Sequence, residues 1–236
     1  MKISNGILVL ATVSALAVFA ACDGSSSTGT DPQVETPTKP NDSTGTVESG
    51  GKSYRTRTIG GKTWMTENLQ YAGASGNLGS CPGNSQDSCA KYGRLYTWVA
   101  VMGLADSCLV EECADQVKPR HQGICPALWH VPADSEWAAL ARLAGGRDTA
   151  GWKLKAKPNG ALSWNGADSL GFAALPAGYG LSNGKTYHVG ETTYFWSSTE
   201  TGKTFAAHSG FSTESSIMSY GGMNKESEFS LRCVRD

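Results

Sequence analysis

The chain has 236 residues, and its 20 basic and 21 acidic residues leave a formal net charge of −1. No basic stripe or cluster of Lys and Arg is present, which argues against a nucleic-acid partner. All seven tryptophans follow residue 50, and the segment 51–236 is long enough to bury one core, so we predict a single domain there.

Residues 1–21 have the features of a secretory signal peptide. Lys2 precedes an apolar run that is shorter than the roughly 20 residues a helix needs to span a bilayer. The ending Ala20-Ala21-Cys22 resembles a bacterial lipobox, in which the cysteine thiol accepts a diacylglyceryl group and becomes the new N-terminus. We therefore expect an outer-membrane lipoprotein of the cell envelope, periplasmic or surface-exposed, that contacts the membrane only through its lipidated Cys22. An uncleaved anchor is the alternative, and it too would leave the rest of the chain outside the cytoplasm.

Residues 22–50 are rich in Ser, Thr, Gly, Pro, Asp and Lys, and Val34 and Val47 are their only aliphatic residues. Such a segment cannot bury enough apolar surface to become ordered. We predict that it is a lipidated cysteine followed by a disordered linker, which holds the domain away from the membrane.

The cysteines after Cys22 form an even set, which outside the cytoplasm indicates a disulfide framework. Two pairs are close enough in sequence to close their own loops, and this leaves a third, long-range pair. The predicted bridges are Cys81–Cys89, Cys108–Cys113 and Cys125–Cys233. The alternative is a zinc site made by Cys108, Cys113, His121 and Cys125. Structural zinc ligands usually come as closely spaced pairs, so we expect bridges, no metal and no cofactor.

The periodicity of apolar residues predicts an α+β fold with short antiparallel strands and many loops. Gly60-Gly61 is a two-residue hairpin signal between the first two strands. One clear helix is predicted over Asp134–Ala144, between Pro132 and Gly145-Gly146. Leu95–Val99 is a strand or a short helix. The predicted strands are Tyr54–Ile59, Lys62–Met65, Phe172–Leu175, Thr186–Val189, Tyr194–Ser198 and Phe229–Val234.

The stretch "GICPALWHVPADSEWAAL" (123–140) places Cys125, His130 and Glu136 close together, like the parts of a nucleophilic enzyme. Each residue has a plainer structural role. Cys125 has a disulfide partner, and Glu136 lies three residues after the expected N-cap, where it can accept from a free backbone N–H. A Cys/His nucleophile needs a free thiolate, so we predict a packed His130 and no enzyme.

Aromatic residues gather in the second half of the domain, where Asn183-Gly184 predicts a tight turn. Most Trp and Tyr side chains pack in cores, and the alternative is a flat platform for a sugar ring with amide groups beside it. The candidate ligand-binding residues are Trp164, Asn165, Tyr179, Tyr187 and Trp196.

Six blocks occur in order along residues 51–236: "TIGGKTWMTENL", "YGRLYTW", "GICPALWHVPADSEWAAL", "GFAALPAGY", "YFWSSTE" and "SLRCVRD". Together they resemble the Fibrobacter succinogenes major paralogous domain family. The resemblance implies a secreted or lipid-anchored surface protein. It implies no particular activity or ligand.

"VPADSEWAALARLAGG" and "SLRCVRD" are also similar to two landmarks of the formylglycine-generating enzyme fold, its Leu-Pro-Thr-Glu-x-Glu-Trp helix start and its closing Gly-Phe-Arg strand. That fold is a variant of the C-type lectin fold, so the similarity implies a single C-type-lectin-like domain. The lectin fold also bridges its helix region to its last strand. The enzyme's copper-binding cysteine pair is missing here, and the lectin calcium motifs are echoed only by "KPN" (157–159) and "WNG" (164–166).

These observations predict a surface-anchored, non-catalytic module that binds extracellular polysaccharide or another surface glycan. A display scaffold for protein–protein or adhesion contacts is the second hypothesis. An enzyme of the formylglycine-generating type is the third.

Overall fold

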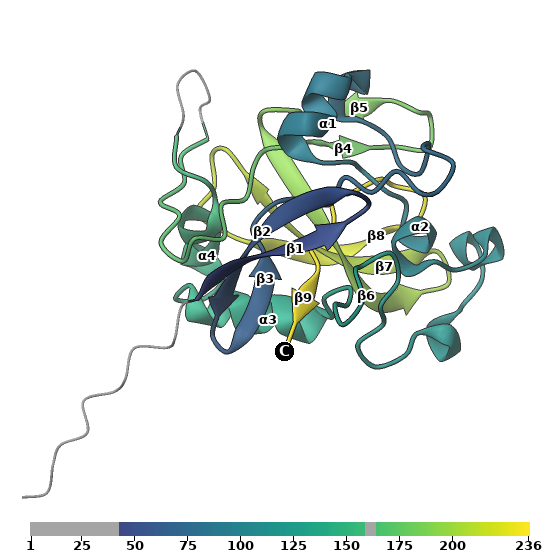
Figure 1. Ribbon diagram of the computed structural model, residues 1–236, viewed down its shortest axis with the longest axis horizontal. Coiled ribbons are helices and arrows are strands. Elements are labelled where there is room, and N and C mark those ends of the chain that lie inside the picture. The colour runs from purple at the N-terminus through teal and green to yellow at the C-terminus, as the bar shows by residue number, and fades with distance from the viewer. Residues whose placement is uncertain (1–42, 159–163) are drawn as a thin grey trace, which may run out of the picture. The chain divides into compact units, whose positions relative to one another are not determined.

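The computed structural model describes residues 43–158 and 164–236 (Figure 1). The signal segment 1–21, the lipidation site Cys22 and the linker as far as residue 42 lie outside the described residues, as does Asn159 of the "KPN" motif. All described residues belong to one unit, Lys39–Asp236.

The described residues form an α+β fold, as predicted, with nine strands and four α-helices (Figure 1). The strands are β1 (Thr44–Ser49), β2 (Lys52–Ile59), β3 (Lys62–Met65), β4 (Tyr179–Gly180), β5 (Thr186–Tyr187), β6 (Thr192–Gly202), β7 (Phe205–Ser212), β8 (Ser219–Asn224) and β9 (Val234–Arg235). The helices are α1 (Gln86–Tyr92), α2 (Trp98–Met102), α3 (Asp134–Leu143) and α4 (Arg147–Leu154). Three 3-10 turns are η1 (Pro82–Asn84), η2 (Asp106–Leu109) and η3 (Ala114–Gln116).

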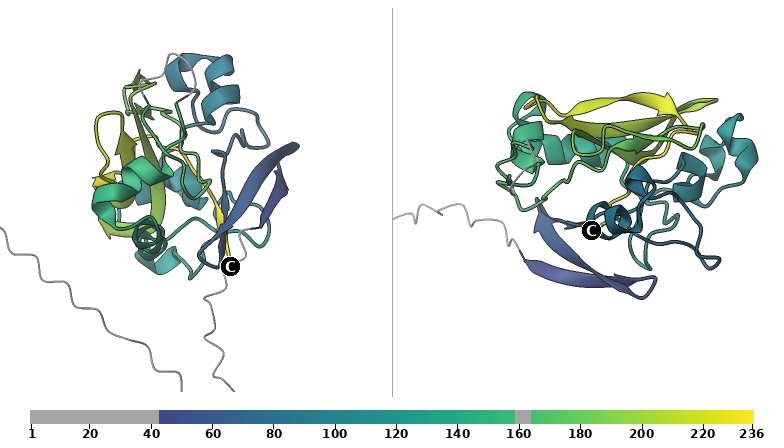
Figure 2. Two further views of the ribbon diagram at one scale, coloured as in Figure 1. Left: turned by 90° about the vertical axis from the view of Figure 1, so that its left-hand side faces the viewer. Right: turned by 90° about the horizontal axis from the view of Figure 1, so that it is seen from above.

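The strands form three antiparallel sheets, in the orders β1-β2-β3-β9, β4-β5 and β6-β7-β8. β9 pairs with β3 through Trp64 and Val234, so the last strand lies beside the first hairpins. Figure 2 shows the β1–β2 hairpin and the β6–β7–β8 sheet on opposite sides of this unit. The first sheet therefore brings together chain segments that are far apart in sequence.

The Gly60-Gly61 hairpin is confirmed, with Ile59 paired to Lys62. Both glycines have positive φ, 61° and 85°, as a two-residue turn between antiparallel strands requires. Gly50-Gly51 makes a second turn of this kind, with φ values of 58° and 76°.

The prediction of a disordered linker up to residue 50 is wrong for Thr44–Ser49, which form β1. β1 pairs with β2 along its whole length, and Val47 lies opposite Tyr54. The backbone hydrogen bonds come from β2, and Val47 packs against the core. Composition alone therefore could not reveal this strand, because its order depends on a partner.

Helix α3 is confirmed at Asp134–Leu143, and it buries Trp137, Leu140 and Ala141. The prediction of one clear helix is wrong, because α1 and α4 are also present. α4 contains Gly151, which weakens a helix in isolation. Its position is set by packing, since a Cβ at Gly151 would lie 2.6 Å from the Ile217 carbonyl oxygen.

The other predicted strands are partly confirmed. Tyr194–Ser198 lies within β6, and Thr186–Val189 is shortened to β5 because His188 has a positive φ of 53°. Leu95–Val99 ends in α2, and its first two residues make isolated bridges. In place of the other two predicted strands, Ala174 makes one isolated bridge, and Phe229 and Ser230 make isolated bridges ahead of β9. A single bridge needs no alternation of apolar and polar residues, so the sequence pattern cannot distinguish it from a strand.

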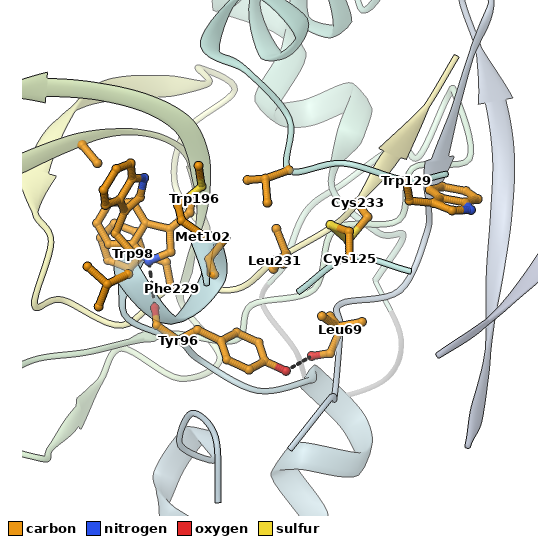
Figure 3. Close-up of a cluster of buried hydrophobic side chains, with 14 of the residues drawn as sticks. Leu69, Tyr96, Trp98, Met102, Cys125, Trp129, Trp196, Phe229, Leu231 and Cys233 are labelled. Carbon is orange, nitrogen blue, oxygen red and sulfur yellow. Dashed lines mark hydrogen bonds between the residues drawn. A yellow bond between two sulfur atoms is a disulfide. The ribbon is translucent and has the colours of Figure 1, made fainter. Parts of the chain in front are cut away.

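Six of the seven tryptophans are buried, and Trp152 is exposed. One core cluster contains Trp98, Trp196 and Phe229, and it continues to the Cys125–Cys233 bridge (Figure 3). A second cluster, to which α3 contributes Trp137, contains six large rings, namely Trp64, Trp137, Trp164, Phe172, Phe195 and Phe211. Trp137 and Phe195 approach to 5.3 Å between ring centroids. The tryptophans therefore serve mainly to build the core.

The three disulfides pair as predicted: Cys81–Cys89, Cys108–Cys113 and Cys125–Cys233. The zinc alternative is wrong, because its three cysteines are in bridges and His121 Nε2 lies 2.7 Å from the Met102 carbonyl oxygen. Among residues 43–158 and 164–236, none of the helices has the length and hydropathy needed to cross a bilayer.

Three cationic side chains are buried in the core. Lys225 Nζ donates to the carbonyl oxygens of residues 108, 111 and 203 and pairs with Glu200. Lys155 Nζ donates to Asn165 and to the carbonyl oxygens of residues 212 and 215. Arg232 donates to Asn68 and to carbonyl oxygens of residues 172 and 173. Each cation is thus surrounded by oxygen atoms, as burial of a charge requires.

Candidate functional site

The three side chains that resembled a nucleophilic triad make the structural contacts predicted for them. Cys125 is bonded to Cys233. His130 is buried, with Nε2 at 3.0 Å from Glu136 Oε1. Glu136 Oε2 accepts from the Ala133 N–H at 2.9 Å, which caps α3. His130 and Glu136 therefore hold the start of α3 in place, and Cys125 joins the segment before it to the C-terminal segment.

Two of the predicted ligand-binding residues are core residues, so their assignment to a sugar platform is wrong. Trp164 is 1% exposed, and its Nε1 donates to the Ala174 carbonyl oxygen at 2.7 Å. Trp196 is fully buried, and its Nε1 donates to the Tyr96 carbonyl oxygen at 2.7 Å. Both rings have their single polar group satisfied by the backbone and show no open face.

Asn165 is exposed, but its side chain has an internal partner. Its Oδ1 accepts from Lys155 Nζ at 2.6 Å, and the same ammonium lies 5.0 Å from the Trp164 ring. Burial lowers the pKa of Lys155 to about 8. The Asn165 side-chain oxygen therefore accepts a hydrogen bond from a core lysine.

Tyr179 and Tyr187, the other two predicted residues, are brought together. They are paired across β4 and β5, and their ring centroids lie 5.8 Å apart in a stacked arrangement. The Asn183-Gly184 turn builds this hairpin, since Asn183 Oδ1 accepts from the Lys185 N–H at 3.0 Å. Asn183 Nδ2 also donates to the Tyr187 hydroxyl at 2.9 Å. The turn thus positions the ring as well as the backbone.

Two further rings join this pair, and sequence reasoning did not select them. His188 stacks on Tyr179 at 5.8 Å, and Tyr194 meets Tyr179 edge to face at 5.5 Å. We call Tyr179, Tyr187, His188 and Tyr194 the tyrosine cluster. Tyr194 precedes Trp196 by two residues on β6, so the period of a strand places both rings on one face. That period predicts burial for both, and only the structure shows that Tyr194 is partly exposed.

The tyrosine cluster is aromatic at its centre and polar at its edge. His188 is exposed, and the three tyrosines are partly exposed. His188 Nδ1 lies 2.8 Å from Glu191 Oε2, and burial raises the pKa of the Tyr194 hydroxyl, with a smaller contribution from Tyr179. Flat rings beside amide, carboxylate and hydroxyl groups can cover the apolar face of a sugar and bind its hydroxyls.

Beneath the cluster lies His208 of β7, 5.3 Å from Tyr194 and 5.4 Å from Phe229. Burial lowers the pKa of His208. In the described part of the chain, no three or more His, Cys, Asp and Glu side chains are grouped so as to hold a metal ion.

No curated protein and no solved structure is detectably similar to the chain. The model of the Fibrobacter succinogenes major domain matches residues 58–235, which include every strand from β4 onward and all four helices. The chain therefore belongs to the Fibrobacter succinogenes major domain family.

Proposed function

We propose that this domain is a non-catalytic module that binds extracellular polysaccharide or another surface glycan through the tyrosine cluster. The observation that supports this role is the contact at the surface of three tyrosine rings from β4, β5 and β6 with His188, which follows β5. Aromatic faces bind sugars by covering C–H groups, and rings fixed by neighbours lose little entropy on binding.

The chemistry of the remaining residues supports binding over catalysis. All six cysteines of the described part are in disulfides, so none of them offers a thiol. His130 and Glu136 are bonded to each other and to α3. An enzyme of the formylglycine-generating type would need cysteines that are free to react.

We also propose that the fold is a variant of the C-type lectin fold, and that a lipid on Cys22 anchors the protein to the membrane. The Cys125–Cys233 bridge supports the first, because it joins the region before α3 to the last strand. The lipobox-like ending at residues 20–22 supports the second. An anchored binding domain would hold its cell against an insoluble polymer.

The test is retention on insoluble polysaccharides, plant and bacterial. Tyr187→Ala should weaken retention about tenfold, because it removes a ring from the cluster and leaves the core intact. Tyr187→Phe should retain binding if stacking dominates. Trp152→Ala is the matched control, since it removes an exposed aromatic ring from α4.

Retention that survives Tyr187→Ala would contradict the proposed surface. Loss with Trp152→Ala alone would place the site on α4.

The second candidate is a display scaffold for protein or adhesion contacts, and one observation favours it. Trp152 and Ile217 are 46% and 42% exposed. Their segments touch, because the Trp152 N–H donates to the Ser216 carbonyl oxygen at 3.2 Å. Exposed apolar pairs are typical of protein contact surfaces. Wild-type protein that binds none of the polysaccharides would favour this candidate.

A further inference from the structure

An open cleft of about 610 Å³ lies between the segment that follows β3, helix α2, turn η2 and the segment before β9. Tyr71 lines it together with the polar residues Ser75, Asn77 and Thr97, and glycines and small or aliphatic side chains line most of the rest. Its two charged groups are the carboxylates of Asp106 and Glu228, and no Lys, Arg or His contributes to its lining. The cleft has the size of a small-ligand site and a negative character.

Glu228 is firmly placed. Its N–H and carbonyl oxygen bond to Gly180 of β4 at 2.9 and 2.8 Å. Ser80 Oγ donates to its Oε2, and a Cβ at Gly180 would lie 2.5 Å from that oxygen. The carboxyl group is therefore held on one side by a hydroxyl and by close packing, and its other oxygen is left for a ligand.

This carboxyl group has no cation beside it. No Lys, Arg or His lies within ion-pair distance of Glu228 in the part of the chain that the structure describes, and the same holds for Asp106. Burial raises the pKa of Glu228, as expected for a desolvated acid without a cationic partner. An acid of this kind in a cleft favours a ligand that supplies positive charge.

We propose that the cleft binds an amino sugar whose nitrogen is not acetylated, with the ammonium group against Glu228 and Asp106. The inference rests on the proposed function in that the ligand is a glycan. Tyr71 offers a ring for the apolar face of the pyranose, and Asn77 and Thr97 offer hydrogen bonds to its hydroxyls. A neutral N-acetyl sugar would leave both carboxylates without a counter-charge, and an acidic sugar would be repelled.

The experiment compares a glucosamine tetramer with an N-acetylglucosamine tetramer by calorimetry, at a pH that keeps the amine protonated and the carboxyl group of Glu228 ionised. The wild-type protein should bind the glucosamine tetramer at least about tenfold tighter. Glu228→Gln should remove most of this preference. Glu226→Gln is the matched control, because it removes the same charge from an exposed position two residues away. Asp106→Asn, at an exposed site, tests the second carboxylate should Glu228→Gln fail to fold.

Equal affinity for the two tetramers, or unchanged affinity in both carboxylate variants, would overturn the inference. Equally tight binding of Nα-acetyllysine methylamide would also overturn it, since a basic peptide would then be the occupant. Tyr187→Ala separates the two proposals. It should spare glucosamine binding while it weakens retention on neutral polysaccharide, so either proposal can fail alone.

Discussion

Glu136, in the first turn of α3, makes contacts with three separate groups. It accepts from the Ala133 N–H, lies beside His130 Nε2 and pairs with Lys62 at 3.0 Å. Burial alone would raise the pKa of its carboxyl group, but these hydrogen bonds and charges lower it to about 2. One carboxylate thus joins β3, the segment before α3 and the helix itself.

We predict that Glu136→Gln destabilises the domain and removes part of its acid sensitivity. Because the folded pKa is depressed, the stabilisation is present above the unfolded value of 4.5 and is lost as pH falls towards 2. The full shift corresponds to about 3 kcal/mol. Urea unfolding between neutral pH and pH 2 should show this loss for the wild type and a flatter curve for Glu136→Gln. Equal slopes would contradict the assignment, and Glu226→Gln is the control.

At the scale of elements, buried lysines organise the loops between helices and strands. Lys225 Nζ donates to the carbonyl oxygens of residues 108 and 111 within the Cys108–Cys113 loop, and Glu200 accepts from the Cys113 N–H at 3.0 Å. The ammonium also lies 5.0 Å from the Trp98 ring. The ammonium group of Lys225 resembles a structural metal ion in this respect, because oxygen atoms from separate segments of the chain surround one positive charge.

Lys225→Met should destabilise the domain by about 3–5 kcal/mol, since it leaves Glu200 as an unpaired buried charge. The double variant Lys225→Met/Glu200→Gln should recover part of the loss by removing that charge. Urea unfolding gives the free energies, and hydrogen exchange over residues 104–116 reports on the loop. The exposed Lys203→Met is the control. A Lys225→Met variant as stable as that control would show that the pair contributes nothing.

For the molecule as a whole, the C-terminal segment joins the parts of the domain. Val234 pairs with Trp64 in β3 and bridges to His130. Cys233 binds Cys125 across a sequence separation of 108 residues. Strand pairing and a covalent bond thus act at the same place, and the two cysteines belong to the core cluster of Figure 3.

Removal of the long bridge should cost more than removal of a short one. Loop entropy gives about 4.7 kcal/mol for Cys125–Cys233 and about 2 kcal/mol for Cys108–Cys113. Paired Cys→Ala variants compared by urea unfolding should show this order. Equal losses would mean that local strain, and not loop length, sets the contribution.

The tertiary structure decided which aromatic residues can meet a ligand. Trp164, Trp196, Tyr179 and Tyr187 are all aromatic residues in the loop-rich second half of the domain. The two tryptophans are nevertheless buried, whereas the two tyrosines stack at the surface. Whether a side chain is buried depends on which face of its segment packs against a distant part of the chain. Short loops have no regular spacing of apolar residues from which that face could be predicted. The cleft at Glu228 has the same origin, because its lining comes from four separate segments.

By itself the sequence determined the local features and the pairing of the cysteines. Turn glycines specified the hairpin at residues 60–61, apolar spacing specified α3, and cysteine spacing specified the three bridges. The turn and helix signals act over a few neighbouring residues. The cysteine signal extends further along the chain, because a disulfide can form only with another cysteine. Only the tertiary structure decided the order of β1, the position of α4, the solvation of the buried lysines and the tyrosine cluster, because each depends on contacts between segments far apart in the chain.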